Sequence, residues 1–193
     1  MNVHSMDRPD KREAILEAAL ELFGELGFHG AAVPQVAERA KVGAGTIYRY
    51  FPSKEALVNE VYRLWKGKLG EALLADYPAL APVREQFHHF WTRATGFALA
   101  HPRAVLFLEL HHHAPYLDAR SREVEEALLK PATAALEQAA EAQIVKSLAP
   151  GLLMSVVWGA FVGVMKAGWE GRLALTPETL AQAEMCCWEA IRR

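Results

Sequence analysis

The sequence has little cysteine and no strong excess of either charge. Its two cysteines, Cys186 and Cys187, are adjacent, and adjacent side chains on a helix point about 100° apart, which disfavours a mutual disulfide and a CxxC site. This cysteine usage is typical of a reducing cytoplasm. The net charge of -2 over 193 residues excludes a globally basic nucleic-acid coat. Any DNA binding must therefore come from a local patch.

The sequence also lacks a signal-peptide pattern and a long apolar run. The N-terminal stretch MNVHSMDRPDKREAIL does not follow a charged segment with an apolar one. The longest nearly uncharged apolar run is GLLMSVVWGAFVGVM at 151–165, which is shorter than the roughly 20 residues that span a bilayer. We therefore interpret this run as a buried helix and expect a cytoplasmic protein with no membrane partner.

Strand-like alternation is missing as well, and apolar residues recur instead at steps of three and four, the period of amphipathic helices. Prolines and glycines fall at the junctions between these periodic segments. Pro131 predicts a kink or a restart within its segment. Helices are predicted at 12–26, 33–40, 46–51, 54–76, 83–100, 103–113, 118–144, 150–168 and 177–192.

The run VPQVAERAKVGAGTIYRYFPSKEAL, at 33–57, carries the strongest functional signal. It reads as a short helix, a glycine turn, a second short helix and the start of a long helix capped by Ser53. A helix that enters the DNA major groove, about 12 Å wide, needs a small footprint and polar tips. The second short helix supplies both. The residues concerned are Ala44, Gly45, Thr46, Tyr48 and Arg49.

Three further features complete the interpretation of this run. We expect Ile47, Tyr50 and Phe51 to form the inward face of the second short helix, and Gly43 and Gly45 to relieve the backbone of the turn. Residues 39–68 contain seven basic and two acidic side chains, a local charge of +5. The basic residues are Arg39, Lys41, Arg49, Lys54, Arg63, Lys66 and Lys68.

The run resembles the TetR family of transcriptional repressors. The matching residues are Val36-Ala37, the heptapeptide GTIYRYF at 45–51 and SKEAL at 53–57. The resemblance implies that Thr46, Tyr48 and Arg49 face DNA beside Ala44 and Gly45, that Tyr50 lies near the DNA backbone, and that Lys54 meets a phosphate. The chain departs from the family pattern in two places. It has Ala31 and Ala32 where a threonine cap is usual, and Gly43 and Ala44 where Ser and Lys are usual.

We therefore predict an all-α protein of about nine helices, with a three-helix, helix-turn-helix DNA-binding domain and a larger helical domain for effector binding and dimerisation. The predicted division is 1–53 for the DNA-binding domain, 54–76 for a long linking helix and 77–193 for the C-terminal domain. The resemblance implies a dimer that a small apolar or amphipathic ligand releases from a palindromic operator. No cofactor is predicted.

A stripe of small residues in the 150–168 helix predicts the dimer interface. Ser155, Gly159 and Gly163 recur every four residues and would let another helix approach closely. The last helix adds Cys187 and Ile191 at a helical spacing. The resemblance agrees, because the last two helices of the family form a four-helix bundle between subunits. In the alternative interpretation, the stripe packs only within its own subunit.

Large apolar side chains in the middle of the chain predict a pocket for a drug-sized ligand. His89, Glu109 or His111 would add polar contacts to it. The predicted ligand-binding residues are Trp65, Phe90, Phe107, His111, Trp158 and Phe161.

The histidine run at 111–113 leaves a metal-responsive regulator open as an alternative. Consecutive helical residues diverge by about 100°, whereas helical metal pairs favour a spacing of four, so no metal site is predicted. A helical metal-dependent enzyme is the less favoured alternative. The sequence contains no GxSxG, GxxxxGK or GxGxxG. We therefore expect a protein that is not an enzyme.

Overall fold

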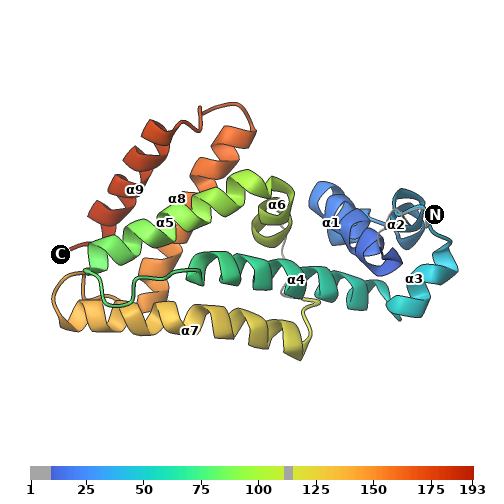
Figure 1. The fold of residues 1–193 in the computed structure, drawn as a ribbon, viewed down its shortest axis with the longest axis horizontal. Coiled ribbons are helices and arrows are strands. Elements are labelled where there is room, and N and C mark those ends of the chain that lie inside the picture. The colour runs from blue at the N-terminus through green and yellow to red at the C-terminus, as the bar shows by residue number, and fades with distance from the viewer. Residues whose placement is uncertain (1–9, 111–114) are drawn as a thin grey trace, which may run out of the picture. The chain divides into compact units, whose positions relative to one another are not determined.

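The computed structural model describes residues 10–110 and 115–193, and this part of the chain forms nine α-helices without a strand (Figure 1). Its extended pairing is confined to an isolated antiparallel bridge between Val145 and Arg192. The all-α prediction is confirmed. The helices are α1 (Lys11–Gly30), α2 (Val33–Arg39), α3 (Ala44–Tyr50), α4 (Lys54–Leu74), α5 (Val83–Ala100), α6 (Pro102–Leu110), α7 (Ala119–Glu141), α8 (Pro150–Trp169) and α9 (Pro177–Ile191).

The contacts divide the chain into two compact units. The first comprises residues 1–67 and 101–122, and the second comprises residues 68–100 and 123–193. The boundary at Gly67 falls inside α4, so this one helix contributes residues to both units. The boundaries of the two units therefore differ from the predicted division at residues 53 and 76. Helix α6 belongs to the first unit.

In the first unit, α1 is the central packing element. Asp10 caps it by accepting a hydrogen bond from the Arg12 amide at 3.2 Å. Gly27 interrupts its helical backbone with a φ of 69°, directly after residue 26, where the sequence predicts the helix to end. Helix α6 packs on α1 next to Gly24, where an added Cβ would lie 3.4 Å from a carbonyl oxygen of α6. The fully buried Phe107 ring packs against Phe23 at this contact.

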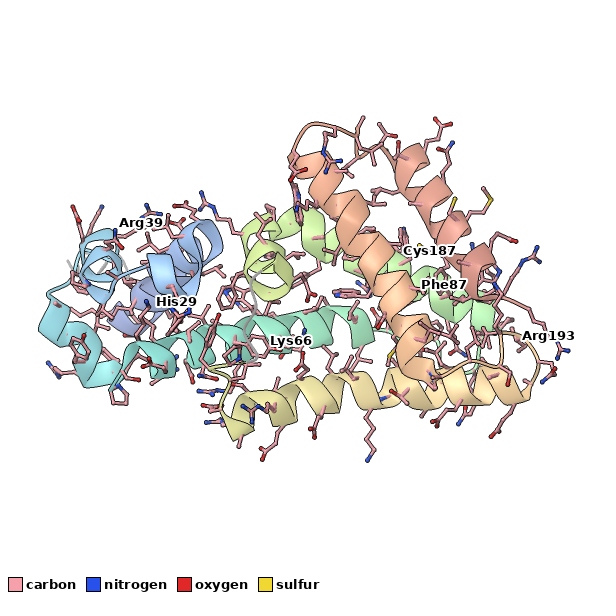
Figure 2. The ribbon with its side chains drawn as sticks, turned by 180° about the vertical axis from the view of Figure 1, so that it is seen from behind. His29, Arg39, Lys66, Phe87, Cys187 and Arg193 are labelled. Carbon is pink, nitrogen blue, oxygen red and sulfur yellow. The ribbon has the colours of Figure 1, made fainter. Side chains whose placement is uncertain are left out.

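In the second unit, α5, α7, α8 and α9 surround an apolar core. The Trp91 indole N–H donates to the Leu180 carbonyl at 3.0 Å and so joins α5 to α9. Phe87 of α5 and Cys187 of α9 also belong to this unit (Figure 2). Helix α7 runs through Pro131 as one helix. Part of the core consists of Ala139, Val145, Leu153, Val157 and Ile191.

Helix α8 is longer than its apolar run suggested and is buried on one side only. With 20 residues, it is the one helix in the described ranges that is long and apolar enough to cross a membrane by length and composition. Leu153, Val157 and Phe161 are buried in the second unit. Leu152 and Val156 are exposed, and only 22% of the apolar window is buried. The prediction of a buried helix therefore holds for one face and not for the other.

Candidate nucleic-acid interface

Helices α2 and α3 form a helix-turn-helix whose turn depends on a lysine. Lys41 adopts a left-handed backbone with a φ of 55°, and the Val42 amide donates to the Ala37 carbonyl at 2.9 Å to close the turn. Gly43 has an ordinary φ of -70°, and Gly45 lies within α3. The prediction that these two glycines relieve the turn is therefore wrong, because the left-handed position precedes both.

The start of α2 shows how the chain replaces the usual threonine cap. Ala31 is buried and Ala32 has no side-chain donor or acceptor. Instead the Gln35 carboxamide oxygen accepts a hydrogen bond from the Ala32 amide at 2.8 Å. The first turn of α2 is thus stabilised from inside the helix.

Helix α3 presents small and polar groups outward. Ile47 is buried beneath it and Phe51 is buried just past its end. Tyr48 is 53% exposed and Tyr50 is 41% exposed, so Tyr50 was wrongly placed on the inward face, although the same exposure suits a role near DNA. An added Cβ at Gly45 would meet nothing within 4 Å. Ala44, Gly45 and Arg49 are also exposed, and Thr46 is half-buried.

Lys54 begins α4 directly after this surface. Ser53 caps the helix as predicted, accepting a hydrogen bond from the Ala56 amide at 3.1 Å. The Lys54 ammonium lies 4.4 Å from the centroid of the Phe28 ring. Partial burial lowers the pKa of Lys54, and the neighbouring Glu55 carboxylate opposes this effect. Lys54 is thus a cation held against an aromatic face.

The predicted basic patch contains fewer outward-facing cations than the seven basic residues counted in the sequence. Arg39 pairs with Glu21 at 3.2 Å, and Lys66, which is almost buried, lies 3.5 Å from Glu109 (Figure 2 labels Arg39 and Lys66). A third cation, Arg63, pairs with carboxylates of its own unit. Lys68 belongs to the second unit, so the outward positive charge near α3 is supplied by three of the seven residues. They are Lys41, Arg49 and Lys54.

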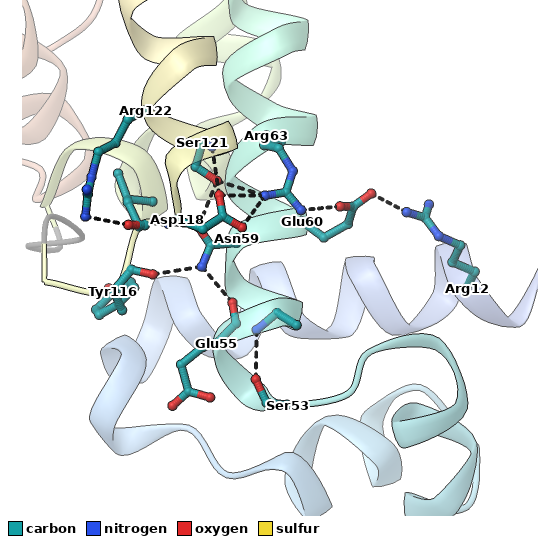
Figure 3. A network of polar contacts seen from close by, with 12 residues as sticks. Arg12, Ser53, Glu55, Asn59, Glu60, Arg63, Tyr116, Asp118, Ser121 and Arg122 are labelled. Atoms are coloured by element: carbon teal, nitrogen blue, oxygen red, sulfur yellow. Dashed lines mark hydrogen bonds and ion pairs between the residues drawn. The ribbon is translucent and has the colours of Figure 1, made fainter.

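A buried asparagine, not anticipated from the sequence, joins α4 to the connection between α6 and α7 (Figure 3). Asn59 is 2% exposed. Its amide nitrogen donates to the carbonyls of Glu55 and Tyr116, both at 2.8 Å. Its carbonyl oxygen accepts from the Asp118 amide at 2.9 Å and from the Ser121 hydroxyl at 2.8 Å. All hydrogen-bonding positions of this side chain are thus used.

An ion-pair chain continues from the same place (Figure 3). Arg63 donates to the Asp118 carboxylate at 2.8 Å and to Glu60 at 2.6 Å, and Glu60 also accepts from Arg12 of α1. Burial would raise the pKa of Glu60, but the hydrogen bonds and charges of Arg63 and Arg12 outweigh it and lower that pKa. This series of ion pairs therefore connects α1, α4 and the start of α7.

The structure brings three of the predicted ligand-binding side chains together. In the second unit, the Trp158 ring stacks on Phe161 with centroids 4.8 Å apart and lies 6.1 Å from Phe90. Trp65 and Phe107 belong to the first unit, where the Trp65 ring lies 5.2 Å from His101. His111 lies outside the described residues, as do His112 and His113. Elsewhere, among the residues that the structure describes, no group of three or more His, Cys, Asp or Glu could hold a metal ion.

The predicted interface residues separate into two sets. Ser155, Gly159 and Gly163 are exposed, and an added Cβ at either glycine would meet nothing within 4 Å. Cys187 and Ile191 are buried within the subunit. The outer face of α9 instead carries Ala181, Met185 and Cys186.

The family follows from comparison with known proteins. Residues 66–193 match a family model described as the tetracyclin repressor-like, C-terminal domain. Residues 15–61 match one described as bacterial regulatory proteins, tetR family. The chain belongs to the TetR family. It is a helix-turn-helix transcriptional regulator, as the motif predicted.

Individual TetR-type relatives are similar over different shares of the chain. The transcriptional regulator RutR of Escherichia coli is 43% identical over 79 residues, which is 39% of this chain and only 37% of RutR. YhgD of Bacillus subtilis is 25% identical over 175 residues, covering 89% of this chain and 91% of YhgD. A TetR family structure from Marinobacter aquaeolei aligns with a TM-score of 0.85 at 21% identity, covering 94% and 95% of the two chains. This last likeness concerns the fold.

Proposed function

We propose that this TetR-type regulator is a cytoplasmic, dimeric repressor that inserts α3 into the major groove of a two-fold operator. The outer face of α3 carries the proposal. Tyr48 and Arg49 are exposed while Ile47 and Phe51 anchor the helix from below. The open space at Gly45 would let the start of α3 approach DNA closely. Tyr48 and Arg49 then contact bases, Thr46 and Tyr50 lie beside the backbone, and Lys54 binds a phosphate.

Two features of the second unit support the proposed dimerisation and ligand response. The outer face of α8 combines exposed apolar side chains with Ser155, Gly159 and Gly163, and α8 contacts α9 within the same unit. A second copy covering this face would bury it, as two packed helices from each subunit do in a bundle. The aromatic cluster of Phe90, Trp158 and Phe161 suits an apolar or amphipathic ligand.

Selection of bound sequences from random DNA duplexes tests the proposal. A dimeric regulator should enrich an inverted repeat, and recovery of no preferred sequence contradicts it. With the enriched duplex, Arg49→Ala should cost about 1 to 3 kcal/mol and relax the preference at particular base pairs. Lys54→Ala should weaken all sequences alike and flatten the salt dependence by about one unit. Lys130→Ala, which removes an exposed charge from α7, is the matched control and should change neither quantity.

A further inference from the structure

Two aromatic rings lie in series behind Lys54. The Lys54 ammonium lies over the Phe28 ring. Of the three aromatic rings that contact Phe28 in the described part of the chain, the Tyr116 ring is the one stacked on it, at a centroid distance of 4.2 Å and an interplanar angle of 23°, while Phe23 is tilted and His29 meets it edge-on. Phe28 follows the interruption of α1 at Gly27, and Tyr116 belongs to the connection between α6 and α7. All three residues lie in the first unit. A connecting segment far from α3 in the sequence thus reaches the predicted phosphate contact through one intermediate ring.

The position of Tyr116 is itself fixed by α4. Its carbonyl oxygen accepts the hydrogen bond from Asn59 at 2.8 Å, and two residues later the Asp118 amide donates to the same side chain. Asn59 lies five residues beyond Lys54 on α4 and is buried. Because an unsatisfied buried amide is costly, the backbone at Tyr116 is tied to the helix that Lys54 begins. The Tyr116 ring therefore packs on Phe28 from a backbone that is held in place by α4.

We propose that Tyr116 is a positioning residue for DNA binding, which acts through Phe28 to hold the Lys54 ammonium where a DNA phosphate can meet it. The proposal rests on the phosphate role of Lys54 in the proposed function. A lysine side chain has a flexible four-carbon stem, and an aromatic face restricts it while leaving N–H donors for a phosphate. Binding then loses less side-chain entropy. The connection between α6 and α7 sets DNA affinity without touching DNA.

A double-mutant cycle tests this proposal in the full-length protein, with mixed-sequence duplex DNA as the probe because a phosphate contact does not depend on sequence. Tyr116→Leu should lower the affinity about two- to fivefold for each subunit, the range expected for an exposed cation–π contact. The same substitution should have no effect in the Lys54→Ala background. Tyr116→Phe keeps the stacked ring and should bind like the unmodified protein.

The outcomes separate failure of this proposal from failure of the proposed function. If Lys54→Ala weakens binding and Tyr116→Leu does not, the proposal is overturned and the phosphate contact stands. An equal loss from Tyr116→Leu in both backgrounds assigns Tyr116 a general structural role and also overturns it. If Lys54→Ala changes neither the affinity nor the salt slope, the phosphate contact and the proposal both fail.

A second measurement covers the case in which Tyr116→Leu does not fold. Phe28→Leu interrupts the same series at its middle ring and should reproduce the loss of affinity and its dependence on Lys54. In NMR spectra of the unmodified protein, the ε-methylene protons of Lys54 should be shifted upfield by the Phe28 ring current. Lys54 protons at ordinary shifts would overturn the proposal irrespective of any variant.

Discussion

Gly45 is the residue at which folding stability and DNA binding should respond in opposite directions. It lies within α3, and an added Cβ would meet nothing in the free protein. Gly45→Ala should therefore stabilise the fold by about 0.5 to 1 kcal/mol, because alanine is the better helix former. The same methyl group should weaken operator binding where the start of α3 approaches DNA.

The measurement pairs urea unfolding with titration of the enriched duplex. Gly96→Ala is the matched control, since Gly96 is also helical, exposed and open in the structure but lies on α5. It should give the gain in stability and leave DNA affinity unchanged. Equal DNA affinity for Gly45→Ala and the unmodified protein would contradict close approach at this position.

The recognition helix also shows where single residues could be predicted and where they could not. The buried position of Ile47 and the cap at Ser53 follow from local sequence, and both are confirmed. Tyr50 was misplaced because a seven-residue helix has fewer than two turns, so periodicity does not fix which of its last residues turn inward. The left-handed turn residue, Lys41, could not be predicted either, because glycines nearby are the usual occupants of that conformation.

Among the elements, the ion-pair chain joining α1, α4 and the start of α7 should make stability depend on acid. Burial would raise the pKa of Asp118, but the Ser121 amide and Arg63 lower it, and the pKa of Glu60 is lowered as well. The unfolded chain therefore binds more protons in acid than the folded one does. This contribution is fully present above the ordinary carboxyl range, about pH 4, and is lost as the pH falls through the lowered folded values.

Urea midpoints measured from pH 7 down to pH 3 check this expectation. Asp118→Asn should reduce stability at pH 7 and make the decline in acid less steep, because one of the two titrating groups is gone. Asp76→Asn is the control, since its side chain is 91% exposed and bonds only a surface arginine in the second unit. If the stability of Asp118→Asn falls in acid as steeply as that of the unmodified protein, Asp118 does not contribute to the pH dependence.

The helices were easier to predict than the contacts between them. Pro150 and Pro177 begin their helices at the predicted positions because proline suits the first helical turn. The pairing of Asn59 with residues 116–121 joins segments more than 50 residues apart in the sequence. Neither composition nor periodicity encodes such a pairing. The basic patch contains fewer outward cations than predicted for the same reason, because Arg39 and Lys66 pair with acidic residues on other helices.

For the proposed dimer, the exposed glycines of α8 give a specific expectation. Gly159→Leu and Gly163→Leu should each yield monomers, since both positions are open in the single subunit and lie on the proposed interface. Sedimentation velocity measures the oligomeric state, and circular dichroism checks that the helices remain. Gly96→Leu is the control, because this site is equally open but lies on α5. If both α8 variants remain dimers, the stripe of Ser155, Gly159 and Gly163 is not part of the interface.

Operator and effector should oppose each other through α4, because this helix begins at the proposed phosphate contact and the boundary between the two units falls within it. A ligand that favours a different tilt of α4 would change the separation of the two recognition helices. Such coupling is reciprocal and typically about 1 to 3 kcal/mol. Saturating ligand should therefore lower operator affinity roughly five- to 150-fold, and saturating operator should lower ligand affinity by the same factor.

Quenching of tryptophan fluorescence by a panel of apolar and amphipathic compounds would identify a ligand for this test. Trp158 stacks on Phe161 and lies near Phe90, so a ligand in that cluster should quench its emission. Trp158→Phe keeps an aromatic ring and should abolish most of the signal while binding, measured by calorimetry, persists. Each ligand is then titrated again with saturating operator present. If the ligand affinity is the same with and without operator, coupling through α4 is refuted, even for a sequence-specific dimer. The reason is thermodynamic: a ligand that lowers operator affinity must have its own affinity lowered by operator to the same extent.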